Sequence, residues 1–219
     1  VNARGERFMN EDTWCQAKSL NVLKQPGNVD YAFAIMDADW REQLIQGMPY
    51  SGGLFNDNSL SVYGEPFTGE REQGFLEMGL KNGTVQQADT IEELAEKIGV
   101  PPHRLRETVD TYNEMVEKKD DTQFGKRAEL LFPIKKPPFY ASKFGPAMLA
   151  VVGGLITDTR LRVLDKEYRP IPGLYAAGNV AGGLYGVDYP TLIPGNSHGR
   201  ALTWGYLAAR FAIEDGEEA

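Results

Sequence analysis

The sequence predicts an α+β fold, and three features of the chain lead to this prediction. Apolar residues recur at helical spacing in the middle of the chain, where one stripe contains Leu105, Val109, Tyr112 and Met115. A short apolar run at residues 174–177 is typical of a buried strand. A cluster of glycines follows this run and leads into another stretch with helical periodicity. Helices and strands are therefore both expected.

The elements of the first part of the chain can be placed in order. An opening hairpin is expected before a helix at residues 14–23, a strand at 31–36 and a helix at 39–46. Residues 47–69 are rich in turn-forming residues and are expected to hold exposed loops.

Two further helices are predicted from residue 90 onward. Thr90 and Glu93 form a capping box ahead of an apolar run, and Gly99 is placed to end that helix. Pro101 and Pro102 restart the chain, and a proline in the first turn suits the helix that carries the apolar stripe.

The C-terminal part contains a glycine-rich loop and a final helix. Gly178 follows the apolar run, and a helix begins near Pro194, with Asn196 or Ser197 as the expected N-cap and Gly216 as the expected stop. The first N–H groups of a helix have no internal partner, and its dipole is positive at that end. This turn could hold a phosphate or another anionic oxygen, but the same residues also fit an ordinary strand, turn and helix.

Composition excludes several classes of function. The formal net charge of -8 argues against a nucleic-acid partner, because phosphate binding needs a basic face. No apolar run is long enough to span a membrane. Cys15 is the one cysteine, so it cannot form an internal disulfide, and with two distant histidines it gives no metal-ligand pattern.

Several of these stretches together resemble the C-terminal end of the FAD-dependent fumarate reductase and succinate dehydrogenase flavoproteins, and the related ketosteroid dehydrogenases. Residues 153–158 match the family's GG-x-x-x-D segment, and residues 171–179 match I-P-G-L-Y-A-A-G-E except at Asn179. Residues 195–197 match the G-N-S turn, and residues 1–11 are similar to the V-N-x-x-G-x-R-F-x-N-E strand pair of the capping domain.

The resemblance implies a particular domain organisation. Residues 1–145 would form the flavoprotein capping domain, and residues 146–219 would supply the C-terminal strands and helix of an FAD-binding α/β domain. The G-x-G-x-x-G turn of such enzymes is absent from this sequence, so we expect the chain to be a piece of a longer flavoprotein. The C-terminal part should then expose apolar surface or be covered by a neighbour.

The resemblance also implies which residues contact the cofactor. The expected FAD-binding residues are Gly178, Asn179, Gly195, Asn196 and Ser197. Asn179 stands where the family usually has a glutamate that holds a ribityl or ribose hydroxyl. The start of the final helix would lie under the flavin ring and stabilise its negative charge.

The substrate-binding positions of the fumarate reductases are not retained. The proton-donating arginine falls on Cys15, the carboxylate-binding histidine on Leu149 or Ala150, and the carboxylate-binding arginine on Tyr189. Tyr189 and Pro190 instead resemble the Y-P element of ketosteroid dehydrogenases, in which the tyrosine hydroxyl holds a ketone oxygen. Tyr189 is therefore the candidate catalytic residue, and a packed or rim tyrosine is the alternative interpretation.

Together these features predict a fragment of an FAD-dependent oxidoreductase that transfers hydride between flavin N5 and a carbon-carbon bond conjugated to a carbonyl. The partner is a small-molecule substrate, with electrons from a haem or flavin domain outside this chain. The fragment alone is expected to be inactive. Two alternatives remain: a fumarate reductase or succinate dehydrogenase with an altered substrate clamp, and a non-catalytic, stand-alone binding module.

Overall fold

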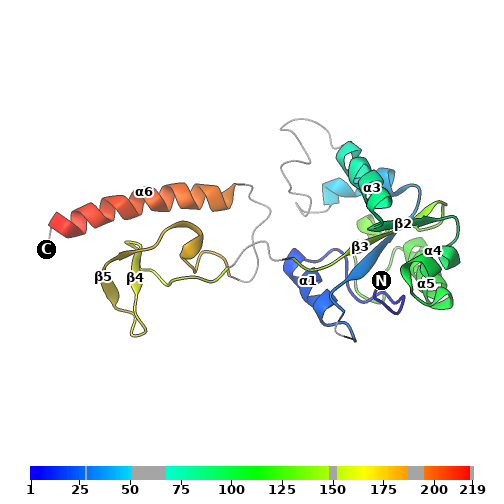
Figure 1. The fold of residues 1–219 in the computed structure, drawn as a ribbon, viewed down its shortest axis with the longest axis horizontal. Helices are drawn as coiled ribbons and strands as arrows, with labels where there is room; N and C mark the ends of the chain where they lie inside the picture. The colour runs from blue at the N-terminus through cyan, green and yellow to red at the C-terminus, as the bar shows by residue number, and fades with distance from the viewer. Residues whose placement is uncertain (28, 51–67, 148–151, 187–194, 218–219) are drawn as a thin grey trace. The chain divides into compact units, whose positions relative to one another are not determined.

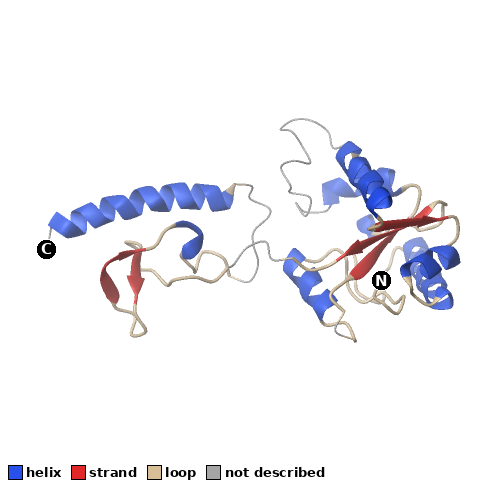
Figure 2. Cartoon of the chain, viewed as in Figure 1, coloured by secondary structure: helices blue, strands red, loops and turns tan. Residues whose placement is uncertain are grey.

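The computed structural model describes residues 1–27, 29–50, 68–147, 152–186 and 195–217. The chain divides into two units, Val1–Ala147 and Met148–Ala219 (Figures 1 and 2). The described residues combine helices with antiparallel sheets, so the predicted α+β class is confirmed. None of the helices in these ranges is long and apolar enough to cross a membrane.

An antiparallel sheet organises the first unit. Its strands are β1 (Ala32–Met36), β2 (Val85–Ala88) and β3 (Phe139–Phe144), in the order β1-β3-β2. In the register of the sheet, Ala141 lies opposite both Ile35 and Gln86. Side chains alternate between the two faces of a strand, so Phe139 and Ala141 lie on one face, where both are buried.

Two helices build the main core against this sheet. They are α4 (Ile91–Ile98) and α5 (Pro102–Lys118). The Thr90 hydroxyl accepts a hydrogen bond from the Glu93 N–H at 3.1 Å, and Gly99 ends α4 with a φ of 73°, as predicted. The core cluster joins residues of the sheet, of the two helices and of the turn between them: Phe33, Ala88, Ile91, Leu94, Ala95, Val100, Leu105, Val109, Phe139 and Ala141.

Three more α-helices lie in the described part of this unit. The first two, α1 (Cys15–Leu23) and α2 (Trp40–Gly47), agree with the predicted helices to within one residue. The third, α3 (Glu70–Asn82), was not predicted; it packs closely on β2, where a Cβ on Gly79 would lie only 2.4 Å from Val85 Cγ2. Short 3-10 turns occupy Met48–Tyr50 and Ala128–Leu130. Most of the expected loop region, residues 51–67, lies outside the described residues.

The predicted opening hairpin is wrong. Residues 1–11 form turns instead of a strand pair, because the Asn2 side-chain oxygen accepts hydrogen bonds from the N–H groups of Arg4 and Glu6 at 2.9 and 3.0 Å. Val1 pairs with β1 instead: its nitrogen donates to the Phe33 carbonyl at 2.6 Å, and the Phe33 N–H donates back at 2.9 Å.

The second unit contains a hairpin, a short 3-10 turn and a long helix. The hairpin strands β4 (Arg162–Leu164) and β5 (Pro170–Tyr175) pair antiparallel. The 3-10 turn is Gly178–Val180, and the helix is α6 (Asn196–Glu217). The helix continues through Gly216, so this glycine does not stop it as predicted.

The buried strand predicted at residues 174–177 is only partly correct. The strand β5 ends at Tyr175, and Leu174 is 43% exposed. In the described residues, β5 has only β4 as a neighbour, and a two-stranded sheet has too little around it to cover both faces. Ala176, just after the strand, is buried.

Little apolar surface is buried in this unit. Its core cluster contains Val163, Ala176 and Ala181, with Trp204 of α6 packed against them. Large apolar side chains remain exposed across the hairpin, the loops and the helix: Leu155, Ile156, Ile171, Leu174, Val180, Leu184, Leu202, Tyr206 and Ile213. This exposure agrees with the apolar surface that the sequence predicts for the C-terminal part.

Candidate functional site

Two glycines let two backbone segments of the second unit lie against each other. The Leu155 N–H donates to the Val180 carbonyl, and the Gly182 N–H donates to the Leu155 carbonyl, each at 2.9 Å. A Cβ on Gly154 would lie 2.5 Å from the Val180 carbonyl oxygen, and one on Gly182 would lie 2.8 Å from the Gly154 nitrogen. Any side chain at either position would therefore separate the segments.

Gly178 brings the 3-10 turn against α6. It has a φ of 73°, in the left-handed region, and a Cβ there would lie 3.4 Å from the Ala201 side chain. The turn that follows β5 therefore lies next to the first turns of α6. The two predicted cofactor-binding segments, residues 178–179 and 195–197, are thus brought together.

A hydrogen-bonded cluster joins these segments, and we call Asn179, Ser197 and Arg200 the Asn179 cluster. The Ser197 hydroxyl donates to Asn179 Oδ1 at 2.8 Å, and Arg200 Nη2 donates to the same oxygen at 3.2 Å. An arginine can only donate, which identifies the accepting atom as the amide oxygen. Two donors therefore fix the orientation of the Asn179 amide.

Arg200 is a site residue that sequence reasoning missed. It is only 6% exposed, and its guanidinium lies over the rings of Tyr185 and Trp204, at 4.9 and 5.2 Å from their centroids. Among the described residues, no partner accepts a hydrogen bond from its buried Nε. The sequence contains one signal for this role. Arg200 follows Ser197 by three residues and precedes Trp204 by four, and residues at such spacings lie on one face of a helix.

The start of α6 differs from the predicted cap. The Gly199 N–H donates to the Gly195 carbonyl at 2.8 Å, so Gly195 occupies the cap position and the helix begins at Asn196. The prediction of Asn196 or Ser197 as N-cap is therefore wrong. The Ser197 hydroxyl bonds to Asn179 instead of to its own helix.

The other end of α6 is held to the hairpin. Arg160 Nη2 pairs with Asp215 Oδ1 at 2.7 Å and with Glu214 at 3.2 Å, and the Tyr175 hydroxyl donates to Asp215 at 2.5 Å. The hydrogen bond from Tyr175, and then that from Arg160, hold the pKa of Asp215 below its ordinary value. Polar contacts thus fix both ends of the helix.

The predicted catalytic residue cannot be placed. Tyr189 lies outside the described residues, as do Leu149 and Ala150, where the resemblance places the missing histidine. Cys15 is the first residue of α1. No group of histidine, cysteine or carboxylate side chains able to hold a metal ion occurs in the described ranges.

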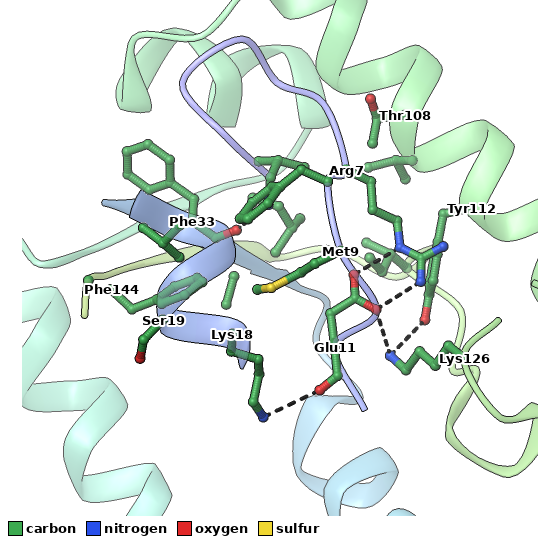
Figure 3. Close-up of a pocket in the computed structure, with 18 of the residues that line it drawn as sticks. Arg7, Met9, Glu11, Lys18, Ser19, Phe33, Thr108, Tyr112, Lys126 and Phe144 are labelled. Carbon is green, nitrogen blue, oxygen red and sulfur yellow. Dashed lines mark hydrogen bonds and ion pairs between the residues drawn. The ribbon is translucent and has the colours of Figure 1, made fainter. Parts of the chain in front are cut away.

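The first unit contains a cavity of about 530 Å³ that sequence reasoning did not find. It lies beside β1, one of the two edge strands of the described sheet, and part of its wall comes from α1 and α5 (Figure 3). Figure 3 shows Phe33 and Phe144 on one side of the view, Arg7, Glu11 and Lys126 on the other, and Met9 between them. The wall is therefore apolar on one side and charged on the other.

An ion-pair cluster forms the charged wall. Arg7 bonds to Glu11 through Nε at 2.8 Å and to Asp121 through Nη1 and Nη2 at 2.7 Å. Burial opposes ionisation of Asp121, but hydrogen bonds from Arg7 and from the N–H groups of Lys126 and Phe124 outweigh it and hold the Asp121 pKa well below its usual value. For Glu11, burial is likewise outweighed by the hydrogen bond from Arg7 and by the nearby charges of Lys126 and Arg7, so its pKa is also lowered.

These contacts define two separate features: a glycine-bounded turn against a helix start in the second unit, and an amphipathic cavity in the first. A family model described as an FAD binding domain matches residues 1–191. The chain therefore belongs to the FAD binding domain family, and FAD is its cofactor.

Known relatives support the resemblance to fumarate reductases and ketosteroid dehydrogenases. A vinyl phenol reductase of Lactiplantibacillus plantarum is 33% identical over 221 residues, covering 98% of this chain and 42% of that protein. An NADH:fumarate oxidoreductase of Klebsiella pneumoniae is 38% identical over 214 residues, covering 98% of this chain and 20% of that protein. The chain spans less than half the length of either relative.

A solved structure agrees with this relationship. The 3-ketosteroid delta1-dehydrogenase from Sterolibacterium denitrificans, in complex with 1,4-androstadiene-3,17-dione, matches with a TM-score of 0.70 at 28% identity. The match covers 98% of this chain and 38% of the dehydrogenase chain. The resemblance predicted from the sequence is therefore confirmed.

The residues around the start of α6 fit a group that carries oxygen atoms and negative charge. The first N–H groups of the helix point out of its positive end, and a Cβ on Gly195 would meet no described atom within 4 Å. The buried Arg200 Nε has donor capacity left among the described residues. An FAD molecule offers such oxygens, so the chemistry of this part of the chain suits the cofactor.

Proposed function

We propose that the chain forms part of an FAD-dependent oxidoreductase that transfers hydride between flavin N5 and a carbon-carbon bond conjugated to a carbonyl. The Asn179 cluster at the start of α6 is the observation on which this proposal rests most, because it joins two segments that resemble flavin-binding motifs. The solved ketosteroid dehydrogenase supports this class of reaction, and the relative named vinyl phenol reductase supports a reaction at a carbon-carbon double bond.

Five residues would hold the cofactor in this proposal: Gly178, Asn179, Gly195, Asn196 and Ser197. The backbone N–H groups of Asn196 and Ser197 would donate to flavin oxygens, and Gly195 would allow a close approach. The Asn179 amide, held by Ser197, would contact a sugar or ribityl hydroxyl. When bound, FAD supplies hydride transfer at N5.

Tyr189 would polarise the substrate. Its hydroxyl would donate a hydrogen bond to the substrate carbonyl oxygen and stabilise the negative charge that develops there as hydride moves. The Y-P resemblance to ketosteroid dehydrogenases supports this role. In the same proposal, residues 1–145 form the substrate-side cap and residues 146–219 the end of the FAD domain.

The test uses the longest natural gene product that contains these residues, loaded with FAD and an enone or enoate substrate. Replacing Tyr189→Phe should lower kcat by roughly 100-fold or more with FAD content unchanged, since one donor to a developing oxyanion contributes on that order. Tyr168→Phe is the matched control, because Tyr168 is 70% exposed on the hairpin. A Tyr189→Phe enzyme with an unchanged rate would exclude this role for Tyr189.

A second candidate is a fumarate reductase or succinate dehydrogenase with an altered substrate clamp. The 38% identity to an NADH:fumarate oxidoreductase favours it. Cys15 and Tyr189 stand against it, because neither supplies the positive charge that would compensate a buried carboxylate. Turnover of fumarate or succinate at rates above those of enones would establish this candidate in place of the first.

The electron source would lie outside these residues, in a haem or flavin domain. A non-catalytic binding module remains the other alternative. Absorbance spectra of the purified natural protein separate these cases. A haem or second flavin that is detected in the spectrum and reduces the bound FAD supports a donor domain. Bound FAD that neither a donor nor a substrate reduces supports the non-catalytic binding module.

A further inference from the structure

Two cavities in the first unit share three charged residues. The larger cavity, of about 530 Å³, and a smaller one, of about 320 Å³, are both lined by Glu11, Lys18 and Lys126. We call these residues the junction trio, because they belong to the walls of both cavities. All lining residues of both cavities lie within Val1–Ala147.

The charged groups around the junction trio have a net charge of one positive unit. Arg7 is paired with Glu11 and Asp121, and Lys18 and Lys126 lie beside the same Glu11, so three cations meet two carboxylates. Asp12, which lines the smaller cavity, is paired with its own partner, Arg127. The site therefore favours an anion.

Both lysines have weak contacts and retain donor capacity. Lys126 Nζ lies 3.4 Å from Glu11 Oε2 and 3.5 Å from the Tyr112 hydroxyl, and Lys18 Nζ lies 3.4 Å from the Glu11 backbone oxygen. Charge-assisted hydrogen bonds are shorter, at roughly 2.7–2.9 Å, and an ammonium group has several donors. The Lys126 side chain is only 15% exposed, so its ammonium group has lost most of its contact with water. Hydrogen bonds to a bound anion would compensate for this loss.

The larger cavity offers an apolar surface next to these ammonium groups. Met9, Val22, Phe33 and Phe144 line it, and Figure 3 shows Met9 between the two phenylalanines and the charged side chains. An apolar cavity of several hundred Å³ with a few polar groups at one end is typical of a small-molecule site.

We propose that this site binds a small amphipathic monoanion, with an aromatic or alicyclic body in the larger cavity and a carboxylate between Lys18 and Lys126. The inference goes beyond the proposed function, because it needs no flavin and no residue of the second unit. It would stand even if the chain belonged to a non-catalytic protein.

The first experiment titrates the chain with 3-phenylpropionate and follows its methyl groups by NMR. This probe has no double bond to reduce, so binding is measured apart from turnover. The Met9 and Val22 methyl signals should shift and saturate below about 1 mM. The methyl signals of Leu202 and Ile171, which are exposed in the second unit, should not move. Shifts confined to the second unit, or no saturable shifts, would overturn the proposal.

Variants then separate the charge from the cavity. Replacing both Lys18→Met and Lys126→Met should weaken 3-phenylpropionate binding by roughly tenfold and leave the neutral 3-phenylpropanamide unchanged. Lys81→Met, at an exposed position on α3, is the control and should change neither. Equal affinity of the double variant for 3-phenylpropionate would contradict the carboxylate position.

Ser19→Trp fills the cavity from a partly exposed position on α1 and should abolish binding of both probes. The Ala88 and Leu94 signals, which lie in the core away from the cavity wall, report whether this variant is folded. Binding of 3-phenylpropionate by a folded Ser19→Trp variant with unchanged affinity would exclude the cavity as the site.

Discussion

The two units of the chain are stabilised in different ways. In Val1–Ala147, a sheet and two helices enclose a continuous apolar core in which Leu94 and Leu105 are fully buried. In Met148–Ala219, three small buried residues and Trp204 form the core cluster, and hydrogen bonds and ion pairs fix both ends of α6. The second unit thus has a defined geometry at its polar contacts but leaves its apolar surface available to another partner.

The largest effect is expected from breaking an ion pair of the first unit. It tests whether polar contacts stabilise this unit as they do the second. Arg7→Leu leaves Asp121 buried without its partner and should lower the free energy of unfolding by about 3–5 kcal/mol. Urea unfolding followed by circular dichroism measures the loss. Arg104→Leu is the control: its pair with Glu107 is exposed, so its effect should stay within about 0.5 kcal/mol. Similar losses in both variants would contradict the cluster's importance.

The next prediction compares how much a buried apolar side chain stabilises each of the two units. Leu94→Ala, at a position with 0% exposure, should destabilise the first unit by about 3 kcal/mol. Val163→Ala in the second unit should cost about 1 kcal/mol, because the side chain is smaller and its surroundings can relax. Hydrogen exchange measures each unit separately. Equal losses would show that the two cores are equivalent.

Acid should destabilise the first unit through Glu11 and Asp121. Both carboxyls have pKa values below their ordinary range in the folded chain, so the unfolded chain takes up protons first as the pH falls. The stability that they contribute is present above about pH 4 and is lost progressively below it. Unfolding midpoints measured from neutral pH downward test this. Asp121→Asn should flatten the acid dependence, and an unchanged slope would contradict it.

The smallest effect is expected at the Asn179 cluster. Ser197→Ala removes the hydroxyl that donates to Asn179 and should destabilise the second unit by about 1 kcal/mol. Thr203→Ala, at an exposed position on α6, is the control and should not destabilise it. Hydrogen exchange in the Gly178–Val180 turn is the measurement. Unchanged protection in Ser197→Ala would show that Gly178 packing alone holds the turn.

Elements with strong local signals could be predicted from the sequence. Thr90 and Gly99 mark the ends of α4, and the apolar stripe of α5 has clear helical spacing. The helix α3 was missed because Gly74 and Gly79 interrupt a polar stretch, and Gly79 serves packing on β2 instead of helix formation. The opening segment was misjudged because one side chain, Asn2, folds it into turns.

The candidate site was also only partly predictable from the sequence. Glycines and the G-N-S turn identify the segments that meet at α6, but Arg200 contributes through its burial, which no local pattern shows. The cavity of the first unit depends on residues far apart in the chain, such as Arg7 and Asp121, which are 114 positions apart. Contacts at such separations follow from tertiary packing and are absent from any local window of sequence.

The orientation of the Asn179 amide has a consequence for molecular recognition. Its oxygen is occupied by Ser197 and Arg200, so the NH2 group is what the side chain can offer to a bound molecule. A glutamate at this place would only accept hydrogen bonds, whereas this asparagine donates. The Asn179 side chain therefore favours a bound group that accepts a hydrogen bond. Deamidation of Asn179 to aspartate would reverse this preference, and the new carboxylate would balance the positive charge of Arg200.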